Sequence, residues 1–327
     1  MTGSLHAADP LAYSRPLPIV RTFYPMGFGL ELSTDSREIE KTAESLWSRY
    51  SSMSELPPVR LRVAVSESDA EVAPLPGMPK GQGHLLSIAH GAENFAVADL
   101  ACGFGFACLS RDVAADRAYT IHHFLEPMAY MLLSAARLTM LHAACVSLKG
   151  RGVLLAGDSG AGKTCLAYAC AVRGWTFISG DASALVRDSF AGRVAGRPFA
   201  IRFRESALSL FPELNGYSPK RGMNGKLDIE PPVEDLGIET AVEARVMHVV
   251  FLKRRMDPVG ASVETMSREE AYRRLDQSAM FGDPELLEDY RTSLARFLVA
   301  QRAYELTYSD VEGAERALRM LTGERVS

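Results

Sequence analysis

The sequence contains little cysteine, and its cysteines follow no pairing pattern. Five are spread over 327 residues and none of them forms a C-x-x-C pair, so neither a zinc knuckle nor a redox pair is predicted. We expect them to be small buried side chains in a reducing compartment. The sequence also lacks an apolar run of membrane-spanning length and the basic, then apolar, start of a signal peptide. These absences favour a cytoplasmic protein with no membrane partner.

A strong excess of either charge is absent too. The net charge is -4 at pH 7 and the pI is near 6.0, which argues against a general nucleic-acid binder. Apolar residues make up 47% and charged residues 23% of the chain, as in a globular protein with a substantial core. A chain of this length forms one large domain or two ordinary ones.

What is present is one specific octapeptide. Residues 157–164 read Gly-Asp-Ser-Gly-Ala-Gly-Lys-Thr, which matches the Walker A or P-loop pattern G-x-x-x-x-G-K-[ST] at every position. Glycines let the backbone curl around phosphate with positive φ, the lysine supplies a mobile charge, and the threonine hydroxyl ligates Mg²⁺. The residues expected to bind a nucleotide are Gly157, Asp158, Ser159, Gly160, Ala161, Gly162, Lys163 and Thr164.

The residues on either side of the octapeptide fit the same interpretation. Residues 152–156 are an apolar run suited to a buried strand, and residues 165–173 are rich in alanine and free of glycine and proline, as in a helix. Gly174 follows where a helix C′ residue is expected, and the start of this helix favours an anion. The alternative is a chance glycine-rich turn, which needs no such strand–loop–helix order.

The chain is predicted to divide into residues 1–120 and 121–327. The first region is a smaller, mostly β or α+β region without recognisable chemistry, with a helix at 38–50 and strands at 59–65, 84–89, 94–99 and 105–110. The second begins with an apolar helix at 121–138, where Pro127 takes a first-turn position, followed by a strand at 141–148. Lys149-Gly150 turns this strand directly into 152–156, so the two are predicted to be antiparallel neighbours.

Further elements are predicted beyond the octapeptide helix. They are strands at 175–179, 194–203 and 246–252, a helix starting at 205–211, and helices at 267–277, 284–299 and 313–322. The first of these strands ends just before Asp181. A carboxylate at a strand end commonly holds the Mg²⁺ of a phosphoryl-transfer site, so Asp181 is the predicted metal ligand beside Thr164. The alternative is a solvated turn aspartate after Gly180.

One series of residues resembles a known family. It comprises His142, the octapeptide, Arg173-Gly174 and Asp181, and further on Gly196-Arg197-Pro198, Ile201-Arg202-Phe203, Gly225-Lys226 and the strand before Lys253-Arg254-Arg255. In this order they resemble the C-terminal catalytic domain of HPr kinase/phosphorylase, and most closely the related serine kinases that include those of peptide-modification systems. The resemblance covers roughly residues 121–325. The octapeptide is specific for nucleotide binding, whereas each of the other short motifs is weak on its own.

The resemblance implies a fold, an activity and partners. The family's domain is a compact α/β phosphate-loop kinase domain related to phosphoenolpyruvate carboxykinase, which agrees with the short interval from Lys163 to Asp181. It implies an ATP-dependent kinase that uses Mg²⁺ to phosphorylate a serine or similar hydroxyl on a peptide or small protein. The family tends to form oligomers, so a homo-oligomer is a further expectation. A small-molecule hydroxyl acceptor is the alternative.

One position departs from the family pattern. The family usually has two adjacent aspartates, the first acting as the catalytic acid/base, whereas this chain has Gly180 before Asp181. Glycine cannot accept the proton of the acceptor hydroxyl, and a general base contributes about 10²–10⁴-fold to such a reaction. The chain is therefore predicted to be a slow kinase, a kinase with a relocated base, or a catalytically impaired ATP-binding accessory or regulatory protein.

The catalytic candidates are Asp181, His142, Lys163, Arg202 and Lys226. Asp181 or His142 orients the acceptor hydroxyl, Lys163 holds the phosphates, and Arg202 with Lys226 neutralises the developing charge. The alternatives are a histidine satisfied by strand backbone and a solvated strand edge that Arg202 shares with Arg204; a plain surface loop is favoured for Lys220 and Arg221, whereas Lys226 is supported by the resemblance.

Two other clusters are interpreted as structural. Lys253, Arg273 and Arg274 are interspersed with glutamates, which favours a solvated surface over a site for an acidic partner. The adjacent His122 and His123 point to different sides of any element, and zinc needs further convergent ligands. No metal site is predicted there.

Overall fold

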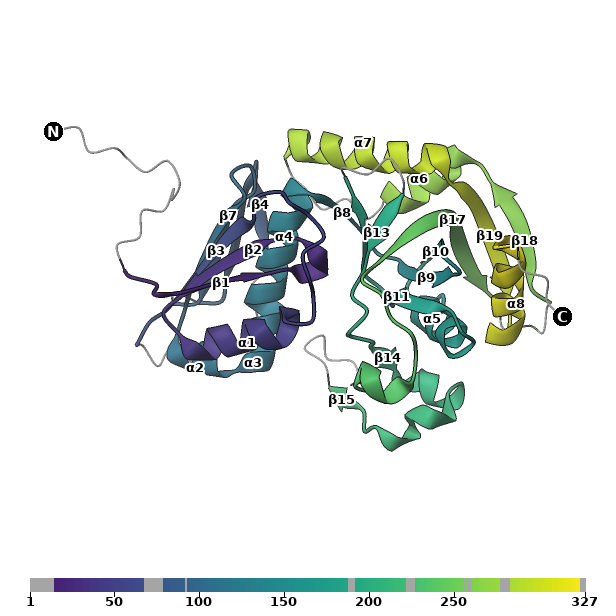
Figure 1. Ribbon diagram of the computed structural model, residues 1–327, viewed down its shortest axis with the longest axis horizontal. Helices are drawn as coiled ribbons and strands as arrows, with labels where there is room; N and C mark the ends of the chain where they lie inside the picture. The colour runs from purple at the N-terminus through teal and green to yellow at the C-terminus, as the bar shows by residue number, and fades with distance from the viewer. Residues whose placement is uncertain are drawn as a thin grey trace. The chain divides into compact units, whose positions relative to one another are not determined.

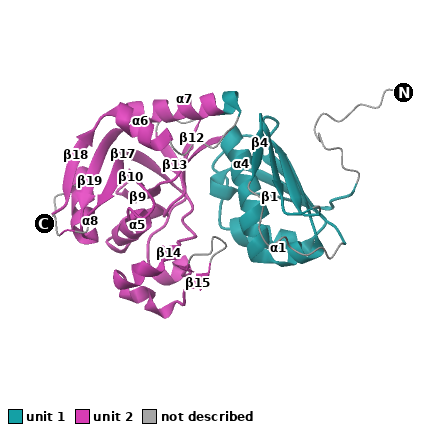
Figure 2. Ribbon diagram, turned by 180° about the vertical axis from the view of Figure 1, so that it is seen from behind, with its two compact units in different colours: residues 1–136, 281–286 teal, residues 137–280, 287–327 magenta. Residues whose placement is uncertain are grey.

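The computed structural model describes residues 15–67, 79–91, 93–187, 192–221, 227–255, 257, 260–276 and 283–323. The chain forms two compact units (Figure 2), the first comprising Met1–Ala136 and Phe281–Leu286 and the second Arg137–Met280 and Leu287–Ser327. Both combine helices with mixed sheets, so the chain is a mixed α/β protein, as predicted. No helix among the described residues has the length and apolar character needed to cross a membrane.

The first unit is built on a seven-stranded sheet in the order β1-β2-β3-β7-β6-β5-β4. Its strands are β1 (Ile19–Phe23), β2 (Leu30–Thr34), β3 (Val59–Val65), β4 (Lys80–Gln82), β5 (Leu85–Ala89), β6 (Phe95–Asp99) and β7 (Phe104–Leu109). β2, β3 and β7 are parallel neighbours, and the other pairs are antiparallel. Its helices are α1 (Arg37–Trp47), α2 (Arg111–Ala115), α3 (Arg117–Thr120) and α4 (Glu126–Ala136), with a 3₁₀ turn at Pro25–Gly27 and a π-helical turn at Ile121–Leu125.

Helix α4 belongs to the first unit because it packs on that sheet. A Cβ at Gly105 of β7 would lie 2.8 Å from Met128 Cε and 3.2 Å from Leu132 Cδ1, so glycine is what lets the helix approach the strand closely. The first unit therefore runs to Ala136, whereas the sequence predicted a boundary between residues 120 and 121. A helix that is apolar on most sides does not reveal from its sequence which sheet it covers.

The second unit contains a nine-stranded sheet with the main path β11-β9-β10-β17-β13-β12-β8, and β19 and β18 join it through β17. The strands are β8 (Leu138–Leu141), β9 (Ala144–Leu148), β10 (Arg151–Ala156), β11 (Thr176–Ser179), β12 (Ser183–Val186), β13 (Arg193–Ala195), β17 (Glu243–Arg254), β18 (Ser262–Met266) and β19 (Arg302–Tyr308). The helices are α5 (Lys163–Val172), α6 (Arg268–Asp276), α7 (Pro284–Ala300) and α8 (Val311–Leu321).

A separate three-stranded sheet, β14-β16-β15, completes the second unit. It consists of β14 (Phe203–Arg204), β15 (Lys220–Arg221) and β16 (Leu227–Ile229), accompanied by short 3₁₀ helices at Glu205–Ser209, Pro212–Gly216 and Val233–Leu236. All three of its strands are short, and both of its strand pairs are antiparallel.

β17 lies at the centre of the nine-stranded sheet (Figure 1). Val250 in β17 pairs in parallel with Leu155 of β10 on one side and with Tyr304 of β19 on the other, while the first residues of β17 pair antiparallel with β13. Neighbouring parallel strands end at the same edge of a sheet, which is where α/β proteins commonly bind ligands. The loop 157–162 follows β10 at this edge.

Helix α5, which follows that loop, is fixed from two sides. Helix α8 contacts it, and the buried Glu315 of α8 accepts a hydrogen bond of 2.8 Å from Trp175 Nε1 just beyond α5. The Tyr168 ring meets the Phe203 ring nearly edge-on at 5.1 Å. The buried residues of α5 are Lys163, Leu166, Ala167, Tyr168, Ala169, Cys170 and Ala171.

The predicted hairpin before the loop is confirmed, although its first strand is shorter than predicted. β9 and β10 are antiparallel, and the turn between them places Lys149 at φ 50° and Gly150 at φ 78°, the left-handed pair that a two-residue hairpin favours. The predicted strand at 141–148 is two strands, because β8 pairs with β12 whereas β9 pairs with β10 and β11. His142 lies in the junction between them.

Two predicted elements beyond α5 also differ from the structure. The predicted strand at 194–203 is interrupted after β13, since Gly196 packs so closely on Ile178 that a Cβ would lie 2.2 Å from the Ile178 carbonyl oxygen. The segment resumes as β14 only at Phe203. The predicted helix at 205–211 is a 3₁₀ helix that ends at Ser209.

Candidate functional site

The loop 157–162 joins β10 to α5, so the predicted order of strand, loop and helix is confirmed. Its three glycines have left-handed backbone angles: φ is 144° at Gly157, 87° at Gly160 and 92° at Gly162. Residues with a Cβ rarely adopt these angles, which explains the glycines at these positions. Gly162 is also the residue from which α5 begins, so the unpaired amides of the first helical turn lie next to the loop. We call residues 157–162 the glycine loop.

Lys163 is buried beneath the glycine loop, with 6% of the residue exposed. Its Nζ donates hydrogen bonds of 2.8 Å to the carbonyl oxygen of Gly157 and 3.1 Å to that of Asp158. Burial lowers the pKa of Lys163, against the opposing charges of Asp181 and Asp158. The groups bonded to this cation are neutral carbonyls. An anion that binds in the loop can therefore form a charge-assisted hydrogen bond with Lys163.

Thr164 connects the glycine loop to the end of β11. Its Oγ1 donates a hydrogen bond of 2.9 Å to the carbonyl oxygen of Gly180, and Asp181 follows with an exposed side chain. A Cβ at Gly180 would lie 3.1 Å from Thr164 Cγ2. A side chain at position 180 would thus extend beside the hydroxyl that the sequence predicts to hold Mg²⁺.

The oxygen atoms of Thr164 and Asp181 suit Mg²⁺ by chemical type. Among the described residues, however, there is no group of three or more histidine, cysteine, aspartate and glutamate side chains that would hold a metal ion. Mg²⁺ is commonly bound by one or two carboxylates together with waters and substrate phosphates rather than by a full protein cage. The donor set therefore fits a magnesium ion that arrives with a nucleotide.

His142 shares this environment with Lys163 and Asp181. Partial burial lowers the pKa of His142, as does the positive charge of Lys163, while the charge and the backbone of Asp181 act in the opposite direction. The junction that carries His142 is fixed on both sides: the amide of Ala143 bonds to the carbonyl of Leu141, and Ser183 Oγ donates 2.9 Å to the carbonyl of Ala143. The structure brings these three predicted residues together.

A cleft of about 950 Å³ opens beside the glycine loop. Its lining residues are His142, Ala156, Gly157, Asp158, Ser159, Phe251, Leu252, Lys253, Glu270, Arg273, Arg274, Leu275 and Glu305. This volume is at the upper end of the range for small-molecule sites. The first residues of the glycine loop form one wall, and α6 with the end of β17 and Glu305 of β19 forms the other.

The wall opposite the glycine loop is a network of charges. Arg274 donates to Glu270 at 2.8 Å and to Glu305 at 3.0 Å, Lys253 Nζ donates to Glu305 at 3.2 Å, and Arg273 pairs with Glu270. Hydrogen bonds from Arg274 lower the pKa of Glu270, and those from Arg274 and Lys253 lower that of Glu305 against the effect of burial. The sequence predicted a solvated surface here, and the side chains of Lys253, Arg273 and Arg274 are 54%, 74% and 38% exposed. The interspersed glutamates were the signal that these cations would be paired.

The remaining predicted catalytic residues are located differently. Arg202 lies directly before β14, and its Nε donates a hydrogen bond of 2.5 Å to Glu230, while Arg204 pairs with the buried Asp228 at 2.5 Å. Arg202 is not among the residues that line the cleft. Lys226 lies outside the described residues. The catalytic roles of both residues stay predictions.

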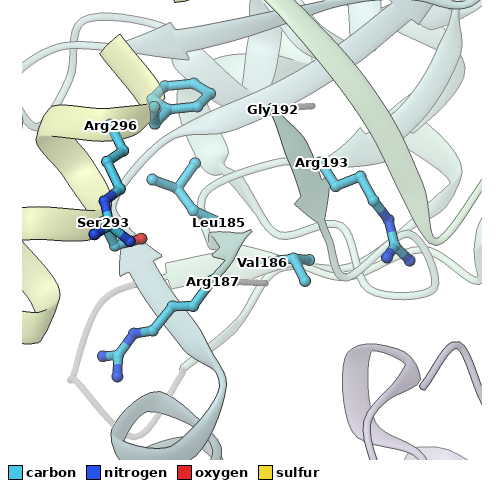
Figure 3. A pocket seen from close by; sticks show the side chains of 8 residues that line it. Leu185, Val186, Arg187, Gly192, Arg193, Ser293 and Arg296 are labelled. Atoms are coloured by element: carbon cyan, nitrogen blue, oxygen red, sulfur yellow. The ribbon is translucent and has the colours of Figure 1, made fainter. Parts of the chain in front are cut away.

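A second hollow in the same unit is too small for a nucleotide. It has a volume of about 30 Å³ and is lined by Leu185, Val186, Arg187, Gly192, Arg193, Ser293, Arg296 and Phe297. That space holds a water molecule or two. In Figure 3 the side chain of Arg193 points away from Ser293 and Arg296, and it pairs with Glu243.

Comparisons with known proteins give a distant structural likeness. No protein-family model matches this chain. No curated protein matches it either. Among solved structures the chain is similar to the HPr(Ser) kinase/phosphatase from Coxiella burnetii, with 12% sequence identity, a TM-score of 0.30, and coverage of 56% of this chain and 90% of that one. A similarity this low does not assign a function to the chain.

Proposed function

We propose that this chain is an ATP-dependent kinase that transfers phosphate to a hydroxyl group of a peptide or small protein. The observation that carries the proposal is Lys163, a buried cation whose hydrogen bonds go to the neutral carbonyls of Gly157 and Asp158. Burying a cation without a bonded counter-ion is costly, and an anion in the glycine loop removes that cost. Polyphosphate is the anion that this loop spacing suits.

The residues around Lys163 have complementary roles in the proposal. The amides of residues 157–162 and the start of α5 bind phosphate oxygens, and Lys163 exchanges its carbonyl partners for the β and γ phosphates. Thr164 and Asp181 hold Mg²⁺, which neutralises phosphate charge when bound. Arg202 and Lys226 keep the role that the resemblance implies, neutralising charge on the acceptor side.

The acceptor hydroxyl must also lose a proton, and Gly180 provides no base. His142 lines the cleft beside the glycine loop, and its lowered pKa keeps the ring neutral at pH 7, as a proton acceptor must be. Asp181 is the alternative base, since its side chain is exposed and it directly follows Gly180, whose carbonyl accepts from Thr164. In either case the base has moved from the position that the family uses.

A nucleotide-binding regulatory protein without transfer activity is the second candidate function. Gly180 is the observation that favours it, because a glycine beside Thr164 has no side chain that could accept the proton of the acceptor hydroxyl. The two candidates share nucleotide binding and differ only in phosphate transfer.

The test is transfer of label from γ-labelled ATP in the presence of Mg²⁺, with and without candidate peptides. We expect the wild-type chain to transfer label, and Lys163→Ala to lower ATP affinity and transfer by about 100-fold or more. Lys41→Ala is the matched control, because Lys41 is an exposed lysine on α1 of the first unit, and it should leave both quantities unchanged.

Each other outcome has a defined meaning. Tight ATP binding with no transfer to any acceptor would reject the kinase and support the regulatory protein. Transfer to small hydroxyl compounds but not to peptides would replace the acceptor class. Absence of ATP binding by the wild-type chain would reject both functions.

A further inference from the structure

Tyr308 reaches the glycine loop from the end of β19, which pairs with β17. It is the last residue of β19 and pairs in register with Arg254 at the end of β17, and it is 1% exposed. Its hydroxyl donates a hydrogen bond of 2.6 Å to the carbonyl oxygen of Ala161. This bond ties the glycine loop to a strand that does not adjoin it in the sequence.

The same hydroxyl packs against the next residue of the loop. A Cβ at Gly162 would lie 2.5 Å from Tyr308 Oη, and Gly162 has a left-handed φ of 92°. There is no room between the tyrosine and the loop backbone, so a shift of either one displaces the other.

Side chains hold three carbonyl groups of the glycine loop, while backbone amides of Ala161 and Leu166 bond to those of Asp158 and Gly162. Those of Gly157 and Asp158 accept hydrogen bonds from Lys163, which under the proposed function turns to phosphate. The carbonyl of Ala161 is held by Tyr308, and this bond does not have to break when phosphate binds. A loop binds an anion through its amides only while its carbonyl oxygens point elsewhere.

We propose that Tyr308 is a positioning residue for the glycine loop: its hydroxyl holds the Ala161 carbonyl in place and so keeps the neighbouring amides directed at a bound polyphosphate. The inference rests on the proposed nucleotide binding by residues 157–164. Burial raises the pKa of Tyr308 to about 12, so the hydroxyl remains a donor throughout the range in which the protein would act.

The test compares two buried tyrosines. Tyr308→Phe keeps the ring and removes the hydroxyl. Tyr290→Phe is the matched control, because Tyr290 is 2% exposed and its hydroxyl donates 3.4 Å to the carbonyl of Met140, in the same unit. Titration calorimetry measures the affinity of the wild-type chain and both variants for Mg-ATP and for inorganic tripolyphosphate.

We expect Tyr308→Phe to weaken the binding of both ligands by about tenfold, as for the loss of one buried hydrogen bond. Equal loss for both ligands assigns the effect to the phosphates, since tripolyphosphate has neither base nor ribose. In the label-transfer assay the KM for ATP should rise while kcat stays within about twofold. Tyr290→Phe should leave both affinities unchanged, and thermal unfolding of each variant confirms that it is folded.

Three results would overturn the inference. One is unchanged affinity for both ligands in folded Tyr308→Phe, which leaves the proposed function standing if the wild-type chain binds ATP. Another is an equal loss of affinity in Tyr290→Phe, which would reflect a general effect of removing a buried hydroxyl. The third is a wild-type chain that binds neither ligand, which would reject the proposed function as well.

Discussion

The glycine loop and the segment that leads into β14 each adjoin a cation predicted to act on phosphate, Lys163 and Arg202 respectively, but the two cations have different bonded partners. Lys163 is 6% exposed and bonds to two carbonyls. The side chains of Arg202 and Arg204 are 47% and 49% exposed, and their partners are the carboxylates of Glu230 and Asp228.

This difference distinguishes an anion site from a structural ion pair. The charge of an arginine that bonds to a carboxylate is already compensated, so its net gain on binding phosphate is small. A buried lysine among neutral carbonyls has no bonded carboxylate to give up. Motif position and charge alone do not separate these two cases, whereas the identity of the bonded partner does.

The largest effect is expected from Arg202→Met. If the role implied by the resemblance is right, phosphate transfer falls by about 100-fold, while ATP affinity is unchanged and the free energy of unfolding changes by less than about 1 kcal/mol, because its partner Glu230 is exposed. Label transfer, calorimetry and urea unfolding measure the three quantities. Unchanged transfer would contradict the catalytic role and leave the three-stranded sheet as a structural element.

A smaller effect is expected from Arg204→Met, and it falls on stability. Asp228 is 3% exposed, and removing Arg204 leaves its carboxylate with Arg202 Nε at 4.0 Å. We expect the free energy of unfolding to fall by about 2 kcal/mol, with ATP affinity unchanged. Urea unfolding checks this, and Asp228→Asn added to Arg204→Met should recover part of the loss. A loss of ATP affinity instead would show that the sheet acts on nucleotide directly.

The smallest effect concerns pH. Partial burial and the charge of Lys163 lower the pKa of His142 below its usual 6.5, so the neutral, proton-accepting ring predominates above that pH and is lost on acidification. We expect kcat/KM for ATP, which reports the free enzyme, to keep more than half of its plateau value at pH 6.5. At lower pH it should decrease further. His142→Asn should lack this acid limb. A midpoint above 6.5 would contradict the assignment of His142 as base.

The parts of the site that were predictable from sequence are those whose contacts are local. The octapeptide fixed the loop, the helix start and the position of Lys163, because its partner Gly157 is six residues away. The hairpin before it followed from Lys149-Gly150, and β3 has the predicted bounds. In these cases the residues that make the contact are also neighbours in the chain.

Contacts between distant segments were not predictable in this way. The bond from Tyr308 to Ala161 spans 147 residues, and β19 itself was not predicted. Lys253, Arg273 and Arg274 line the cleft because β17, α6 and β19 converge there, and this convergence is not visible in the sequence. β2 was not predicted either, although the alternation of apolar and polar residues in Leu30–Thr34 was a usable strand signal.

β17 is the strand on which most of the strand pairing in the second unit's large sheet depends. Its residues pair on one side with β10 and on the other first with β13 and then with β19, so separating any of these strands means opening β17. Amide hydrogens at its centre should therefore exchange with solvent only when the whole unit unfolds, and not through local opening. The glycine loop follows β10, which pairs with β17 from Gly152 to Ala156, so the loop is anchored next to this slowly exchanging strand.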